Sequence, residues 1–291
     1  MDYPSLFPFI EEICTICTEL AHTDWHDNQA GNLSLLLHKS EIETPASMAY
    51  AHDSSEWNYL EEAVPELEGY YLLISRSGQR LKHVMREPSS ALALLRIGKS
   101  GTAWQCAWGL EQGGKPSSEL MVHLLSHRER LVQRGSSRAL LHSHPPYAIA
   151  TSFCLPNSTQ ALNNLVWSSH PEAIAIFPEG IGLLQLMLPG GLHLAKNSAR
   201  ALAEHNLVIW ATHGVIAAAS DFDTCIGYIE VLEKVLKIYT TAKSISAYAA
   251  QSPTSISWTG LMFAPLTQAN IQQLASHFKV SPTWTFKDSG K

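Results

Sequence analysis

The run ALLHSHPP, residues 139–146, places two histidines at the end of an apolar segment, directly before two prolines. The apolar residues predict a buried strand, and the prolines predict where it stops. Residues i and i+2 of a strand share a face and lie about 6.5 Å apart, so a slight bend lets both imidazoles bind one metal ion. The segment therefore predicts a strand over Ala139–His144 that ends in the candidate ligands His142 and His144.

A third histidine stands in a similar setting in the run LVIWATHG, residues 207–214. Three neutral imidazoles that leave one coordination position open are typical of a catalytic zinc site rather than a structural one. In the alternative interpretation His142 and His144 only cap a strand, since His-x-His also occurs by chance. The position of His213 at a second strand end favours the metal site. We therefore predict one Zn²⁺ per chain, bound by His142, His144 and His213.

Composition limits the classes of function. The chain has 291 residues, of which 45% are hydrophobic, enough for one large core or two modest ones. Its 20 Lys and Arg stand against 26 Asp and Glu, a balance that disfavours nucleic-acid binding. No apolar run approaches the ~20 residues of a membrane span, and the first residues lack a basic signal region. We expect a cytoplasmic protein in which Cys14 and Cys17 are core residues.

The chain reads as alternating helices and strands, which indicates one α/β domain over residues 1–291. Apolar residues at helix spacing predict helices over 6–21 and 221–243, a helix that opens after Pro116, and a last one from 267 to before Pro282. Short apolar runs predict strands over 70–75, 139–144, 173–177 and 208–211, and residues 31–37 predict a turn that enters a strand. The Ser- and Ala-rich stretch 244–264 is expected to be irregular.

A carboxylate and several small-residue turns complete the candidate site. Glu119 follows Pro116 in the first turn of a predicted helix, where it could act as a base or only complement the helix dipole. The pairs Gly31-Asn32 and Ser77-Gly78 stand at strand ends, and Ser117-Ser118 stands at a helix start. Such segments direct backbone N–H groups at anions, although each is an ordinary turn or cap when taken alone. Together with the metal they indicate a phosphorylated substrate.

In order and spacing, these motifs resemble the class II sugar-phosphate aldolase family. The string runs from GNLS at residues 31–34 through SG at 77–78, PSSEL at 116–120 and HSH at 142–144 to HG at 213–214. The segments WGL at 108–110, LSH at 125–127 and FPEGIG at 177–182 are most similar to the rhamnulose-1-phosphate aldolases within it. The resemblance implies a three-layer α/β/α domain with a central, mostly antiparallel sheet. It also implies a homotetramer whose sites lie between subunits.

The resemblance further implies residue roles, with zinc on His142, His144 and His213 and with Glu119 as the acid/base carboxylate. The phosphate is expected to lie against Gln29, Gly31, Asn32, Ser77, Gly78, Ser117 and Ser118. Glu172 matches a carboxylate that reaches the neighbouring subunit's site, although a solvated loop acid is an equal alternative. One departure is that this chain has Gln29-Ala30 where the relatives have Asn and Gly, so Gln29 is a doubtful phosphate ligand and Ala30 would resist a positive φ.

The implied reaction is reversible cleavage of L-rhamnulose 1-phosphate to dihydroxyacetone phosphate and L-lactaldehyde. Alternatives are another ketose 1-phosphate such as L-fuculose 1-phosphate, a sugar-phosphate epimerase or dehydratase of the same fold, or an inactive oligomeric interaction module. An inactive module has no need of three histidines and Glu119 together. Metal content separates it from the enzymes, and a panel of ketose 1-phosphates separates the substrates.

Overall fold

The computed structural model describes residues 7–42, 56–111, 113–135, 137–155, 158–251 and 264–282. Within them, nine strands form one sheet in the order β2-β5-β4-β3-β1-β6-β9-β8-β7. Every neighbouring pair is antiparallel except β7 and β8, which run parallel. The strands are β1 (Asn32–His38), β2 (Asn58–Tyr59), β3 (Tyr70–Ser75), β4 (Leu92–Gly98), β5 (Ala103–Gly109), β6 (Ala139–Ser143), β7 (Gly182–Leu184), β8 (Leu207–Trp210) and β9 (Gly214–Ala219).

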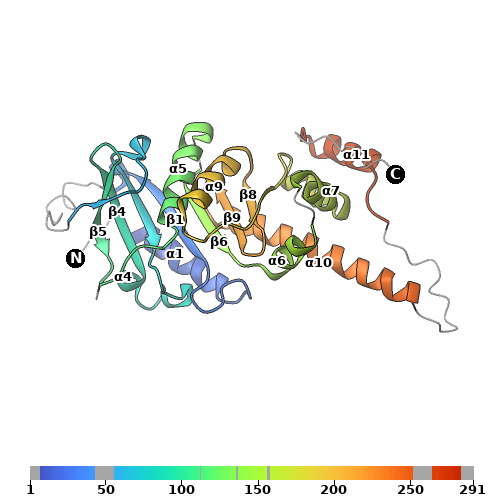
Figure 1. The fold of residues 1–291 in the computed structure, drawn as a ribbon, viewed down its shortest axis with the longest axis horizontal. Coiled ribbons are helices and arrows are strands. Elements are labelled where there is room, and N and C mark those ends of the chain that lie inside the picture. The colour runs from blue at the N-terminus through green and yellow to red at the C-terminus, as the bar shows by residue number, and fades with distance from the viewer. Residues whose placement is uncertain are drawn as a thin grey trace.

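The helices are α1 (Phe7–Leu20), α2 (Lys39–Ile42), α4 (Pro88–Ala91), α5 (Leu120–Arg134), α6 (Pro146–Cys154), α7 (Thr159–Ser169), α8 (Pro171–Ile176), α9 (Leu192–Glu204), α10 (Phe222–Gln251) and α11 (Gln268–Phe278). Two single 3₁₀ turns, Pro65–Leu67 and Leu81–His83, complete the elements. Figure 1 shows α5 and α9 side by side above the sheet, with α1 and α10 on its other side. The predicted fold class, a mostly antiparallel sheet between helix layers, is confirmed.

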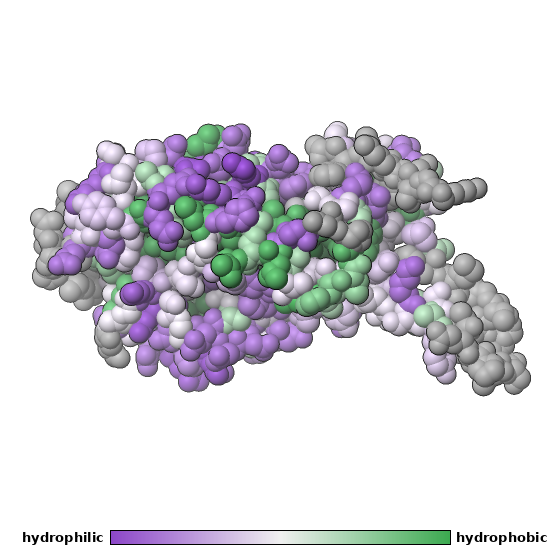
Figure 2. Space-filling view, viewed as in Figure 1, coloured by the Kyte–Doolittle hydropathy of each residue, from purple (hydrophilic) through white to green (hydrophobic). Residues whose placement is uncertain are grey.

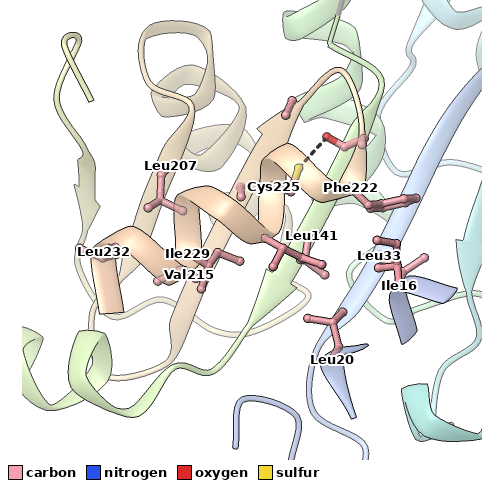
Figure 3. Close-up of a cluster of buried hydrophobic side chains, with 14 of the residues drawn as sticks. Ile16, Leu20, Leu33, Leu141, Leu207, Val215, Phe222, Cys225, Ile229 and Leu232 are labelled. Atoms are coloured by element: carbon pink, nitrogen blue, oxygen red, sulfur yellow. Dashed lines mark hydrogen bonds between the residues drawn. The ribbon is translucent and has the colours of Figure 1, made fainter. Parts of the chain in front are cut away.

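Period-two alternation in the central strands creates the two cores. In β1, Leu33, Leu35 and Leu37 point to the α1 and α10 side, whereas Leu36 points to the α5 and α9 side. Figure 3 shows the first of these cores, in which Leu33 and Leu141 contact Phe222 and other side chains of α10. Because the central strands β1, β3, β6, β8 and β9 are buried on both faces, their segments read as nearly continuous apolar runs.

The α5 face of the sheet carries the polar side chains. His142 follows Leu140 on that face of β6, and Ser34 precedes Leu36 on that face of β1. Asn32 lies opposite His142 in the β1–β6 ladder, and the turn between β8 and β9 ends beside them. The start of α5, the end of β6 and the β8–β9 turn therefore meet at one edge of the sheet.

Two predicted elements were wrong. Residues 173–176 belong to helix α8 and Phe177 caps it, so the segment is not a strand, because Pro171 occupies the first helical position and the His170 ring accepts a hydrogen bond from the Glu172 N–H. Helix α10 continues through residues 244–251, which were expected to be irregular, because their alanines favour a helix. The rest of the stretch 244–264, apart from its last residue, lies outside the described residues. In the described part of the chain, no helix is both long enough and apolar enough to cross a membrane.

Candidate metal and catalytic site

The three predicted histidines come together at the edge of the sheet. His142 is in β6 and only 2% exposed, His144 follows that strand, and His213 lies in the turn between β8 and β9. One ring nitrogen from each histidine lies within 4.8 Å of the other two. Their ring centroids are 4.8 to 5.1 Å apart. These residues form a group that could hold a metal ion.

The backbone around His213 is shaped for this approach. Thr212 adopts a φ of 64°, which is rare for a β-branched residue and is typical of functional sites that store backbone strain. Its N–H donates to the Ser152 hydroxyl at 2.8 Å, which fixes the turn. A Cβ on Gly214 would lie 2.5 Å from the Ser143 carbonyl oxygen and 2.8 Å from the His144 ring. Only glycine therefore lets the two strand ends and their histidines approach so closely.

The protonation of the histidines suits metal binding. The Nδ1 of His142 donates to the Val215 carbonyl at 2.8 Å, so in the neutral ring Nε2 keeps its lone pair. Burial lowers the pKa of His142 and of His144 to about 3, and it also lowers the pKa of His213. All three imidazoles are neutral near pH 7, as metal ligands must be. This set of neutral nitrogen donors fits Zn²⁺.

Glu119 faces the histidines and does not cap its helix. It occupies the N-cap position of α5, yet its side chain makes no capping hydrogen bond and is nearly buried. Its Oε2 lies 3.8 Å from Nε2 of His142 and accepts a hydrogen bond from the Asn32 amide at 2.9 Å. The geometry therefore favours the candidate base over a helix-dipole role alone.

A buried polar cluster behind Glu119 was missed by the sequence analysis. It consists of Asn32 and Ser34 on β1 and His123 and His127 on α5. The spacing of Glu119, His123 and His127, four residues apart on one helix, is the signal that could have revealed it. The Asn32 side chain, predicted to bind phosphate, is engaged with Glu119 and His123. A contact between the Asn32 side chain and the phosphate therefore stays a prediction.

Acidification is expected to destabilise the metal-free protein between about pH 6.5 and pH 4. Burial lowers the pKa of His123 from 6.5 to about 4, and the pKa of His127 is also lowered. Between these pH values the two histidines are protonated in the unfolded chain but stay neutral in the folded protein. The free energy of unfolding is therefore highest above pH 6.5 and decreases as the pH falls. His123 alone accounts for about 3 kcal/mol over the whole window, of which about 2 kcal/mol is lost between pH 7 and pH 5. Urea unfolding in EDTA at pH 7 and pH 5 measures the loss, and equal stability at both pH values would contradict it.

The predicted anion-binding segments are also brought together. The Ser117 N–H donates to the Ser75 carbonyl at 3.0 Å, and the Ser77 N–H donates to the Lys115 carbonyl at 3.0 Å. These bonds join the end of β3 to the segment before α5. Gln29 Oε1 lies 3.7 Å from the position that a Cβ on Gly78 would take, so the third segment reaches the same place.

The turn over residues 27–31 accommodates Ala30 without strain. Its left-handed positions are Asn28, with a φ of 51°, and Gly31, with a φ of 79°. A Cβ on Gly31 would lie 2.3 Å from the half-buried His26 ring, so glycine is required there for space as well as for φ. Arg80 donates to the Asn28 side-chain oxygen at 3.1 Å and ties this turn to the segment after Gly78.

Glu172 is not part of this cluster within the chain. It is exposed in the first turn of α8, where its N–H donates to the His170 ring at 3.2 Å. Among the described residues, its carboxylate forms no hydrogen bond or ion pair with Glu119 or with the three histidines. Both interpretations of this residue therefore stay open.

Comparison with known proteins assigns the family. The model of the class II aldolase and adducin N-terminal domain family matches residues 11–240, so the chain belongs to that family. The rhamnulose-1-phosphate aldolase of Listeria welshimeri is 30% identical over 279 residues, which cover 94% of this chain and 93% of that protein. The enzyme of the same name from Yersinia pseudotuberculosis is 32% identical over 238 residues, covering 81% and 86%.

A solved structure agrees. The sugar-phosphate aldolase from Thermotoga maritima superposes with a TM-score of 0.69 at 26% identity, over 82% of this chain and 97% of that one. The predicted family resemblance is confirmed. So is the prediction of an enzyme, a carbon–carbon lyase, since the family match and the names of the relatives agree on it.

Proposed function

We propose that this enzyme is a zinc-dependent aldolase that reversibly cleaves L-rhamnulose 1-phosphate to dihydroxyacetone phosphate and L-lactaldehyde. The observation that carries the proposal is the convergence of His142, His144 and His213 beside the nearly buried carboxylate of Glu119. The substrate follows from the two relatives of that name, one of which matches 94% of this chain.

The protein groups divide the chemistry between them. The three histidines hold one zinc ion, which supplies Lewis acidity that stabilises negative charge on the substrate oxygens. Glu119 returns a proton to the enediolate that remains after C–C cleavage, and removes one in the condensation direction. The Asn32 amide holds Oε2 of Glu119, so this carboxylate is fixed next to the reacting carbons.

The phosphate group is bound by the three converging turns. We assign its contacts to the side chains of Gln29, Asn32, Ser77, Ser117 and Ser118 and to the backbone N–H groups of Gly31 and Gly78, because the Ser77 and Ser117 N–H groups already donate to backbone carbonyls. Anchoring the phosphate determines which carbon of the ketose faces Glu119. The phosphate therefore contributes to the rate as well as to affinity.

Ser118→Ala and Gln29→Asn are each expected to raise KM for the phosphorylated ketose about ten- to a hundredfold. A hydrogen bond to a charged group contributes about 1.5–3 kcal/mol, which corresponds to that change. The Gln29 side chain extends to the Gly78 turn, so the shorter side chain of asparagine would lose the proposed contact with the phosphate. Steady-state kinetics measure KM, with Gln133→Asn on the exposed last turn of α5 as the matched control. An unchanged KM in Ser118→Ala would argue against a side-chain contact.

The chain is proposed to form a homotetramer in which Glu172 handles the aldehyde end of the substrate in a neighbouring subunit's site. Several large apolar side chains are exposed, among them Phe153 at 69%, Leu186 at 70% and Leu188 at 84%. Figure 2 shows apolar side chains gathered in the middle of one face, and the end of α10 extends beyond the sheet in Figure 1.

Light scattering after size exclusion tests the assembly, and a monomer mass would refute it. Cytoplasmic location stays a prediction.

A substrate panel tests the proposed function. L-rhamnulose 1-phosphate, L-fuculose 1-phosphate and unphosphorylated L-rhamnulose are each incubated with the purified enzyme, and L-lactaldehyde release is measured. We expect the highest kcat/KM for L-rhamnulose 1-phosphate. A higher value for L-fuculose 1-phosphate would transfer the assignment to that substrate. An equal kcat/KM for unphosphorylated L-rhamnulose would contradict the assignment of a phosphate-binding site.

A further inference from the structure

Glu119 stands at the end of a continuous series of buried and partly buried hydrogen bonds. The Asn32 amide nitrogen donates to Glu119 at 2.9 Å, and the Asn32 oxygen contacts Nε2 of His123. The Ser34 hydroxyl lies 2.6 Å from Nδ1 of His123 and 2.8 Å from Nε2 of His127. Ser34 and His123 have no exposed surface, and His127 is 1% exposed.

The periodicities of two elements build this chain. Asn32 and Ser34 are two residues apart on one face of β1, and Glu119, His123 and His127 are four residues apart along α5. Packing α5 on that face of the sheet therefore interleaves the two sets. Four of these side chains are buried and Asn32 is half-buried, an arrangement that is unfavourable unless each one is hydrogen-bonded. The hydrogen-bond series provides a partner for all five.

The number of hydrogens on each group determines the direction of every hydrogen bond in the series. An amide oxygen only accepts, so His123 carries its hydrogen on Nε2 and its Nδ1 accepts from the Ser34 hydroxyl. Because the single hydroxyl hydrogen of Ser34 is donated to His123, the Ser34 oxygen accepts a hydrogen bond from Nε2–H of His127. Burial lowers the pKa of both histidines, to about 4 for His123, which keeps both rings neutral near pH 7 as this assignment requires.

Every donor therefore points toward the carboxylate. Hydrogen bonds in such a series polarise one another, and the series ends on a group that carries a full charge. If His123 did not hold the Asn32 oxygen, the amide could turn and direct that oxygen at Glu119, where two acceptors repel. The orientation of the Asn32 amide thus depends on His123, and the tautomer of His123 depends on Ser34.

We propose that His123 and Ser34 are positioning residues that lock the Asn32 amide and thereby hold the Glu119 carboxylate beside the three histidines. The inference rests on the proposed function, in which Glu119 transfers the proton. It assigns a catalytic consequence to two residues that touch neither the metal nor the substrate. A purely structural cluster would affect stability and leave turnover per folded molecule unchanged.

Ser34→Ala tests the proposal with the smallest change. We expect kcat for L-rhamnulose 1-phosphate to fall about tenfold, the effect of losing one hydrogen bond in a charged series, with KM and metal content unchanged. The matched control is Ser126→Ala on α5, which also deletes a fully buried hydroxyl but one that has no hydrogen-bond partner among the described residues. Ser126→Ala should keep the wild-type kcat.

A second pair of variants covers the case in which Ser34→Ala does not fold. His123→Gln keeps a donor that can reach the Asn32 oxygen, whereas His123→Phe keeps only the ring. We expect His123→Gln to retain more of the wild-type kcat than His123→Phe. Equal loss in both variants would overturn the proposal, because the role of the donor would then be excluded.

The outcomes separate this inference from the proposed function. If the wild-type enzyme cleaves no ketose 1-phosphate, the proposed function fails. If the wild-type enzyme is active and Ser34→Ala keeps its kcat, only the inference fails. A crystal structure of Ser34→Ala adds a readout that needs no substrate. Displacement of the Glu119 carboxylate from Asn32 would support the proposal, and an unmoved carboxylate would overturn it.

Discussion

Glu119→Gln is expected to lower kcat for ketose 1-phosphate cleavage by about 10²–10⁴-fold, the range that general acid–base catalysis contributes. The amide has the size of the carboxylate, and its oxygen can still accept the hydrogen bond that Asn32 donates to Glu119 at 2.9 Å. The packing at the start of α5 should therefore persist. What the variant loses is a group that can take up and return a proton beside the three histidines.

The measurement is kcat at saturating substrate, together with metal content and the urea midpoint. Glu204→Gln at the exposed end of α9 makes the same chemical change away from the site and serves as the control. We expect metal content and midpoint to match the wild type in both variants. If Glu119→Gln turns over at a rate near the wild type, Glu119 is not the base and acts only within the helix start.

His144→Ala is expected to lose the metal and to lower kcat by about three orders of magnitude, since a metal ion stabilises several kcal/mol of transition-state charge. His144 is the suitable ligand to remove because it is partly exposed and lies after β6, whereas His142 is packed within the strand. Its loss removes one of the three ring nitrogens that lie within 4.8 Å of one another.

Elemental analysis of the purified variant gives the metal per chain, and steady-state assays give kcat. His193→Ala, an exposed histidine on α9, controls for loss of an imidazole elsewhere. A His144→Ala protein that keeps both a full equivalent of metal and its kcat would show that this histidine is not a ligand.

The candidate metal ligands could be picked out from the sequence because the signals that mark them are local. His142 and His144 follow an apolar run and precede two prolines, and the structure ends β6 at Ser143, one residue from the predicted end. A short apolar run likewise predicted β3 over its observed residues, and a period of 3.6 predicted α1 to within one residue at each end. These features depend only on neighbours in the sequence.

The errors arose where tertiary contacts, rather than neighbouring residues in the sequence, determine the secondary structure and the side-chain partners. Residues 173–177 form a short apolar run that fits a buried strand or a helix equally well, and Pro171 with His170 starts the helix. The chain of hydrogen bonds behind Glu119 joins residues 87 to 93 positions apart, such as Asn32 with Glu119 and Ser34 with His127. No local pattern states that β1 and α5 pack against each other in that register.

The central claim is that a metal ion on His142, His144 and His213 and the carboxylate of Glu119 together cleave a ketose 1-phosphate. The most direct measurement is dihydroxyacetone phosphate release from L-rhamnulose 1-phosphate by the wild-type protein as purified, after chelation, and after stepwise return of zinc. We predict loss of activity on chelation and recovery that is proportional to added zinc and complete at one equivalent per chain. An undiminished rate in protein shown to be free of metal, or no release at any zinc loading, would contradict the account.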